Sequence, residues 1–111
     1  LYIMQQEELA ETFKALSDAH RLRALRFIAA GAPPGADSGD AVCACHVQDH
    51  LDLSQPATSY HLKVLRQAGL VDAEKRGRWV HYRISDGGLD ALQAFLDEIG
   101  QAGRARPEPV A

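Results

Sequence analysis

The sequence predicts a mainly α-helical domain that carries one small β-hairpin. Four stretches read as helices, and a fifth near the C-terminus repeats apolar residues at helical spacing. Before that last stretch, apolar and polar residues alternate with a period of two around a glycine, which is typical of a hairpin. Only Asp52-Leu53-Ser54 separates the third and fourth helices, as in a helix-turn-helix. This order of elements indicates a winged helix-turn-helix, with the hairpin as its wing.

The first two helices are predicted from apolar spacing and from a capping signal. Leu9, Phe13 and Leu16 recur at helical spacing among charged residues, which indicates an amphipathic helix. Ser17-Asp18 is typical of a helix start, and we expect the second helix to end at Gly31. Residues 32–40 are rich in Pro, Gly and Asp without periodicity and are predicted to form a loop.

A short third helix is predicted over about residues 42–51, and a fourth follows it. Ser54 is a favourable N-cap, and Pro56 is tolerated in the first turn, where backbone N–H groups lack helical partners. Gly69 is expected to end this helix. Its inward-facing residues are predicted to be Leu62 and Leu65.

The hairpin is predicted to pair residues 70–75 with residues 78–84 around Arg76-Gly77. Its inner face would consist of Val71, Ala73, Val80, Tyr82 and Ile84. Gly87-Gly88 is expected to break the chain before a final helix with an apolar stripe that reaches Ile99. We therefore expect one domain over residues 5–101 and a disordered tail over residues 102–111.

Size and charge limit the classes of function. A chain of 111 residues forms one small domain, which buries limited surface as a monomer and so favours a dimer. The net charge is -3, but residues 54–84 carry six basic and two acidic residues, a local charge of +4. Such a stretch is typical of a phosphate-binding face, although a solvated surface has the same composition. With no apolar run of membrane-spanning length and no leader, we expect a cytoplasmic protein without a membrane partner.

Cys43 and Cys45 are the two cysteines of the chain. A single intervening residue suits a disulfide poorly, so the spacing favours metal binding or redox chemistry, with two small buried apolar residues as the alternative. Thiolates prefer soft ions, which favours trivalent arsenic or antimony ahead of cadmium, lead or zinc. Positions i and i+2 of a regular helix face different directions, so the pair can hold one ion only where the helix begins irregularly or distorts. A helix N-terminus is also expected to lower the thiol pKa.

A second metal geometry uses histidine. His46 and His50 share a helical stripe with Cys43, and Asp49 neighbours Cys45 one turn along. Sulfur combined with imidazole suits zinc or cadmium. Lone helical histidines are more often solvated side chains.

The first turns of the fourth helix are predicted to read DNA bases, because the second helix of a helix-turn-helix enters the major groove. The candidate base-reading residues are Gln55, Ala57, Thr58, Ser59 and Tyr60. Lys63 and Arg66 are expected to bind phosphates, and Arg76 and Arg78 at the wing tip to reach the minor groove or the backbone. A two-fold homodimer would read an inverted repeat of double-stranded operator DNA. Apolar stripes on the first and last helices would form the dimer interface, part of the core, or both.

Four stretches together resemble the ArsR/SmtB family of metal-responsive repressors. They are residues 13–18 with 21–23, residues 42–45, residues 53–62 and residues 69–83. The cysteine pair is similar to the motif of the arsenic-responsive branch. The resemblance implies a homodimeric winged-helix repressor, not an enzyme, that leaves its operator when arsenite binds Cys43 and Cys45.

Two departures from the family pattern concern the motif and a helix start. Gln48 stands where the arsenic-branch motif often carries a further cysteine, and Ala19-His20 replaces a capping dipeptide that usually includes proline. The last helix has no histidine, so the site of the zinc-sensing branch looks absent. A third arsenic ligand would then be an exogenous thiol, hydroxide or a residue of the other protomer.

Other functions remain as alternatives. A repressor of the same fold would sense cadmium, lead or zinc, or would respond to oxidation of its thiols. A constitutive DNA binder would use the cysteines structurally. A small thiol enzyme such as an arsenate reductase is the alternative from another class, but the chain has no phosphate-cradling Gly loop and no second cysteine motif to support it.

Overall fold

The computed structural model describes residues 6–31 and 41–106, which form a winged helix-turn-helix. The elements are α1 (Gln6–Ala15), α2 (Ala19–Ala30), β1 (Val42–Cys43), α3 (Ala44–Leu51), α4 (Gln55–Gln67), β2 (Val71–Arg76), β3 (Trp79–Ile84) and α5 (Asp86–Ala105). The predicted fold class is confirmed. The predicted loop over residues 32–40 and the end of the predicted tail, residues 107–111, lie outside the described residues.

The predicted helix caps are present. The Asp18 side chain accepts a hydrogen bond from the Arg21 backbone N–H at 3.1 Å, and Ser54 Oγ accepts from the Ala57 N–H at 3.2 Å. Each satisfies a donor that the first turn of a helix leaves without a partner. At the far end of α4, Gly69 has a φ of +76° and the Leu70 N–H donates to the Leu65 carbonyl at 3.0 Å. This glycine-dependent turn ends the helix as predicted.

The prediction of a helix from residue 42 is wrong at its start. Val42 and Cys43 form the strand β1, and α3 begins only at Ala44. β1 pairs antiparallel with β3, so that Val42 lies opposite Tyr82 and Cys43 opposite His81. The sheet therefore has three strands in the order β1-β3-β2. The cysteine motif is thus anchored to the wing as well as to α3.

The last helix is longer than predicted at both ends. Gly87 and Gly88 lie inside its first turn instead of before it, and it continues through residues 102–105, which the sequence had assigned to the tail. A Cβ atom at Gly88 would overlap the carbonyl oxygen of Gly69. Position 88 requires glycine because α5 passes so close to the backbone of Gly69 that no side chain fits. The helix is not interrupted there.

The buried core draws residues from all five helices and from the sheet. The largest fully buried side chains include Leu62, Leu65, Leu70, Val42, Val47 and Val71. Burying one such side chain contributes about 1.5–3 kcal/mol. Val71, Tyr82 and Ile84 from the predicted inner face of the hairpin are buried or pack against this core. The position of α4 relative to the wing is therefore fixed by apolar packing.

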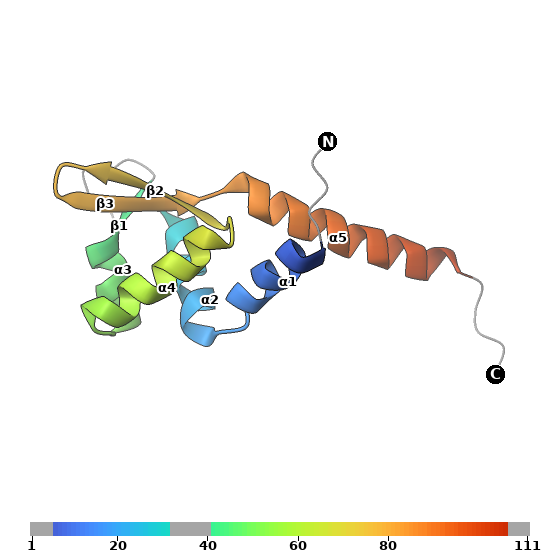
Figure 1. Ribbon diagram of the computed structural model, residues 1–111, viewed down its shortest axis with the longest axis horizontal. Coiled ribbons are helices and arrows are strands. Elements are labelled where there is room, and N and C mark those ends of the chain that lie inside the picture. Colours follow the sequence, from blue (N-terminus) through green and yellow to red (C-terminus); the bar gives the residue numbers. More distant parts are fainter. Residues whose placement is uncertain (1–5, 32–40, 107–111) are drawn as a thin grey trace.

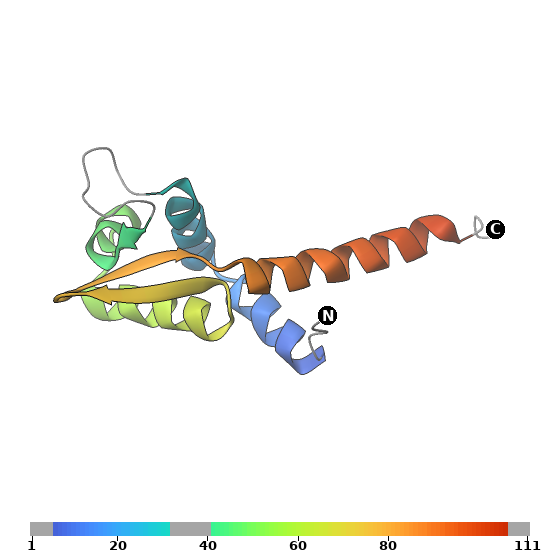
Figure 2. The same cartoon turned by 90° about the horizontal axis from the view of Figure 1, so that it is seen from above.

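α5 projects from this core and gives the molecule its elongated shape, 59 × 28 × 27 Å. In both views the wing tip and the C-terminal end of α5 lie at opposite ends (Figures 1 and 2). Leu92 is buried near its start, whereas Leu96 and Ile99 are 56% and 55% exposed. Phe13 of α1 packs edge-on against Phe95, with 5.8 Å between ring centroids. Among the described residues no helix has the length and apolar character needed to cross a membrane.

Candidate functional site

The two cysteine sulfurs converge where β1 meets α3. Cys43 is the N-cap of α3, with φ -64° and ψ 140°, so it precedes the regular helix that holds Cys45. The sulfur atoms lie 2.6 Å apart, and Cys43 Sγ accepts a hydrogen bond from the Cys45 backbone N–H at 3.3 Å. The irregular start that the spacing demanded is therefore formed by the extended conformation of Cys43. Both sulfurs face the same side without distortion of α3.

The pKa of the Cys45 thiol is shifted in the opposite direction from that expected at a helix N-terminus. Partial burial of the sulfur and the neighbouring Cys43 raise the pKa of Cys45, and the nearby Asp49 carboxylate acts in the same direction. The backbone N–H of His46 opposes this change and does not outweigh it. The expected lowering of the thiol pKa is thus wrong for Cys45. An ion that binds this pair has to displace a proton from Cys45 at neutral pH.

The alternative metal site with histidine ligands is not formed. No three His, Cys, Asp or Glu side chains within residues 6–31 and 41–106 gather closely enough to hold a metal ion. The His50 ring stacks on Phe27 instead, with 4.4 Å between centroids. The donor set is therefore two thiols, which suit a soft ion and leave its coordination incomplete.

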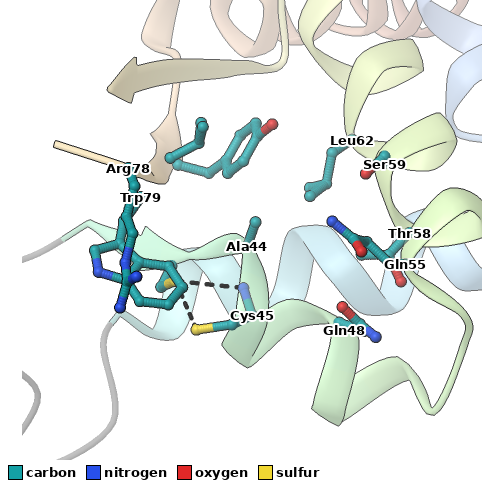
Figure 3. Close-up of a pocket in the computed structure, with 12 residues that line it drawn as sticks. Ala44, Cys45, Gln48, Gln55, Thr58, Ser59, Leu62, Arg78 and Trp79 are labelled. Carbon is teal, nitrogen blue, oxygen red and sulfur yellow. Dashed lines mark hydrogen bonds between the residues drawn. The ribbon is translucent and has the colours of Figure 1, made fainter. Parts of the chain in front are cut away.

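The cysteine pair opens into a cavity of about 390 Å³ between α3, α4 and the wing. In Figure 3, Cys45 and Trp79 lie on one side of the cavity, and Gln48, Gln55, Thr58 and Ser59 lie on the other. The complete lining is Cys43, Ala44, Cys45, Gln48, Gln55, Thr58, Ser59, Leu62, Arg78, Trp79, Val80 and Tyr82. The candidate ion site and part of the candidate DNA-reading surface therefore border one cavity.

Most of the predicted base-reading residues are accessible at the start of α4. Gln55, Ser59 and Tyr60 are exposed, and Ala57 is half-buried. Thr58 differs, because it is only 3% exposed and its hydroxyl has no hydrogen-bond partner among the described residues. A side chain this deeply buried does not reach a base edge, so Thr58 is corrected from the DNA surface to the cavity wall.

The predicted phosphate-binding residues are exposed on α4 and the wing. They are Lys63, Arg66, Arg76 and Arg78. At the wing, Arg76 forms an ion pair with Glu74 at 3.2 Å, and Arg83 approaches the same carboxylate at 3.5 Å. The Arg78 guanidinium lies 5.0 Å from the centroid of the Trp79 ring. Arg78 thus lies at the wing tip and also lines the cavity.

His61 has a structural role on α4. Its Nδ1 accepts from Arg21 Nη1 at 3.1 Å, because a guanidinium only donates, and its ring packs against His20. Burial lowers the pKa of His61, and the Arg21 charge acts in the same direction while Asp18 opposes it. These contacts give His61 a packing role on α4.

The sequence indicates no site role for Leu62, Tyr82 or Trp79, and it marks Gln48 only as the residue that stands in place of a motif cysteine. Trp79 is instead 49% exposed and borders the cavity. The position of Gln48 three residues after Cys45 places both on one side of α3, and this spacing was the available signal. No local pattern connects the wing residues to α3, since strand pairing brings them together.

Comparison with known proteins gives consistent results along the chain. The sequence profile described as "Bacterial regulatory protein, arsR family" matches residues 39–73. An HTH-type transcriptional regulator of Methanocaldococcus jannaschii is 37% identical over 84% of this chain and 96% of its own length. The arsenical resistance operon repressor of Staphylococcus xylosus is 33% identical over 86% of this chain and 84% of its own length. A cadmium resistance transcriptional regulatory protein of Listeria innocua is 34% identical, over 67% of this chain and 56% of that protein.

Solved structures share the fold. An ArsR-like transcriptional regulator from a Rhodococcus species superimposes with a TM-score of 0.71 and 30% identity over 88% of this chain and 84% of that one. A crystal structure of an ArsR family transcriptional regulator has a TM-score of 0.79 with 22% identity, covering 96% and 100% of the two chains. A homodimeric winged helix-turn-helix DNA-binding domain from Mycobacterium bovis has a TM-score of 0.62 with 21% identity, covering 95% and 89%.

Proposed function

Since this chain belongs to the ArsR family of bacterial regulatory proteins, we propose that it is a repressor released from DNA by trivalent arsenic. It binds operator DNA as a homodimer in the cytoplasm, and the ion binds Cys43 and Cys45. The observation that carries the proposal is the shared cavity, because both cysteines line it together with Gln55 and Ser59 of α4. A resemblance to an arsenical resistance operon repressor supports the choice of ion.

Two short connections would couple the ion to DNA. Cys43 belongs to β1, which pairs with β3 of the wing, so a shift of Cys43 acts directly on that strand. Ala44 and Cys45 border the same cavity as the first turns of α4, so an ion there lies beside the residues proposed to contact bases. Coupling between two such sites typically amounts to about 1–3 kcal/mol, or roughly a 5- to 150-fold change in DNA affinity.

The homodimer is supported by the apolar residues that the described chain leaves uncovered on α5. Leu96 and Ile99 are more than half exposed on the helix that projects from the core. The homodimeric domain from Mycobacterium bovis has the same fold. A dimer with two-fold symmetry presents two α4 helices to an inverted repeat, which doubles the few base contacts that one protomer offers.

The test is a DNA-binding titration under reducing conditions with arsenite, antimonite, cadmium, lead and zinc. Arsenite is expected to weaken binding of the wild-type protein to its operator at least fivefold. The double variant Cys43→Ser with Cys45→Ser is expected to bind DNA as tightly as wild type and to ignore arsenite. Because His46 lies outside the proposed donor set, His46→Gln serves as the matched control and should respond like wild type.

Three outcomes would contradict the proposal. Release by arsenite in the double serine variant would place the ion elsewhere. Release by cadmium or zinc but not by arsenite would support the alternative sensor, which the cadmium-resistance relative favours. Release by peroxide alone, without any ion, would support a thiol-redox repressor, since the two sulfurs already lie together.

A further inference from the structure

The cavity beside the cysteine pair has more room than a bare ion needs. Its volume of about 390 Å³ lies in the range of small-molecule sites. Cys43 and Cys45 both line it, so an ion held by the two cysteines has the cavity as its open side. The inference about what else occupies this cavity rests on the proposed function, because it assumes that Cys43 and Cys45 bind an ion.

The cysteine pair leaves trivalent arsenic one ligand short. Trivalent arsenic forms three bonds, and the two thiols provide two of them. Among the described residues no further His, Cys, Asp or Glu joins the pair. Gln48, one turn beyond Cys45, borders the cavity with a carboxamide, which does not replace a thiolate. The third bond therefore goes to a group from outside the described chain.

The cavity wall is suited to a polar organic molecule. Thr58 lines the cavity, but its hydroxyl oxygen is buried away from the open space. Gln48, Gln55 and Ser59 add amide and hydroxyl groups, and Arg78 adds a positive charge on the wing side. These groups match a ligand that carries amides and carboxylates.

We propose that a low-molecular-weight thiol bearing carboxylate and amide groups binds in this cavity and supplies the third sulfur to arsenic. Arsenous acid reacts with Cys43, Cys45 and this thiol. Three As–S bonds form and three As–O bonds break, and each thiol proton leaves with a hydroxide as water. No oxidation state changes. The carboxylates of the bound thiol face Arg78, and its amides hydrogen-bond with Gln48, Gln55 and Ser59.

Native mass spectrometry tests the composition of the complex directly. The reduced wild-type protein is mixed with arsenite alone, with arsenite plus glutathione, and with arsenite plus 2-mercaptoethanol. A protomer carrying one arsenic and one glutathione is expected, and glutathione is expected to raise the apparent arsenite affinity at least tenfold. Mercaptoethanol, which offers sulfur without carboxylates or amides, is expected to raise it less. Phenylarsine oxide, whose arsenic needs only two thiols, should bind equally well with and without glutathione.

Gln48→Cys provides an independent test, because it places a third sulfur from the chain beside the cavity. Its arsenite affinity is expected to become independent of glutathione, and the mixed complex to disappear. Gln48→Ala is the matched control: it adds no sulfur, so its arsenite affinity should still depend on glutathione, although less strongly than in wild type because one amide contact is lost. If Gln48→Cys does not fold, Arg78→Gln serves instead, and it should lose most of the advantage of glutathione over mercaptoethanol.

The outcomes separate the two proposals. Arsenite bound to both cysteines with no thiol adduct and no dependence on glutathione would overturn the mixed complex and leave the repressor proposal standing. A protein that binds neither arsenite nor phenylarsine oxide would overturn the repressor proposal itself. Equal enhancement by glutathione and mercaptoethanol would contradict recognition by the polar wall.

Discussion

Cys43 takes part in three interactions at once. It caps the N-terminus of α3, it pairs with His81 in the sheet, and its sulfur faces that of Cys45. A cap residue has an extended backbone, and this conformation turns the Cys43 side chain toward Cys45. The geometry of the thiol pair is therefore a direct result of where the helix begins.

The capping role predicts a difference between two substitutions. Cys43→Ser keeps an acceptor for the Cys45 N–H, whereas Cys43→Ala leaves that donor without a partner. We expect the alanine variant to be less stable than the serine variant by about 1 kcal/mol. Urea denaturation of the two variants measures the difference. The same pair of changes at the exposed Cys45 should not favour serine, and an equal preference at both positions would exclude a capping role.

His61 predicts how stability changes with pH. Because burial lowers the pKa of His61 in the folded state below the ordinary value of 6.5, the unfolded chain binds the proton more readily. This contribution to stability is complete above pH 6.5 and is lost as the pH falls through the folded-state pKa. The urea midpoint of the wild type should therefore fall more between pH 7.5 and pH 5.5 than that of His61→Gln, whose amide oxygen accepts from Arg21 at both values. Parallel losses would show that another group titrates.

At the scale of elements, the wing connects the two proposed binding functions. Its β3 strand pairs with β1, and Trp79 at its start borders the cavity while it packs against Arg78. Arg78 is exposed and belongs to the basic surface formed by α4 and the wing. An arginine in this position is suited to a phosphate or minor-groove contact that changes when the cavity is filled.

Arg78→Ala is expected to weaken DNA binding by a similar factor for all sequences. The slope of log affinity against log salt concentration should fall by about one, because one phosphate contact is lost. Fluorescence anisotropy over a series of salt concentrations measures the slope. Arg104→Ala removes the same charge near the far end of α5 and should leave the slope unchanged. A change in base preference without a change in slope would instead assign Arg78 to base reading.

The sequence predicted the helices and the hairpin because each has a local signal. Asp18 and Ser54 mark helix starts, and Gly69 marks a helix end, through interactions between near neighbours. β1 has only two residues and exists because β3 pairs with it, and no local period reports such a pairing. The thiol pair could be predicted because its two residues are near neighbours in the sequence. The cavity could not, because Thr58 and Trp79 come from other elements and reach it only through the fold.

At the scale of the whole molecule, α1 packs against α5, and this pair lies away from the wing tip (Figures 1 and 2). Thr12 of α1 donates to the Ala68 carbonyl at 3.3 Å and so ties this helix to the end of α4. The second half of α5 extends beyond the core with apolar residues on its surface. A repressor that binds as a dimer requires a surface of this kind far from its DNA-reading end.

Leu96→Glu is expected to leave each protomer folded and to weaken the dimer about a hundredfold or more, because two unpaired charges would be buried in the interface. Sedimentation velocity measures the association, and circular dichroism confirms folding. Gln101→Glu adds the same charge off the stripe of Leu92, Leu96 and Ile99 and should have little effect. An unchanged dimer in the Leu96 variant would place the interface on another surface.

α5 leaves the DNA-binding half where Gly88 lies against the carbonyl group of Gly69, and no side chain fits between them. The direction of α5 is set at this crossing. In a dimer joined through α5, that direction determines how far apart the two α4 helices stand and how they are turned about the DNA axis. A protein dimer of this kind fits only sites whose halves are separated by a matching number of base pairs. In the proposed dimer, Gly88 would therefore help to set the spacer length of the operator, because a side chain at this position would push α5 away from Gly69.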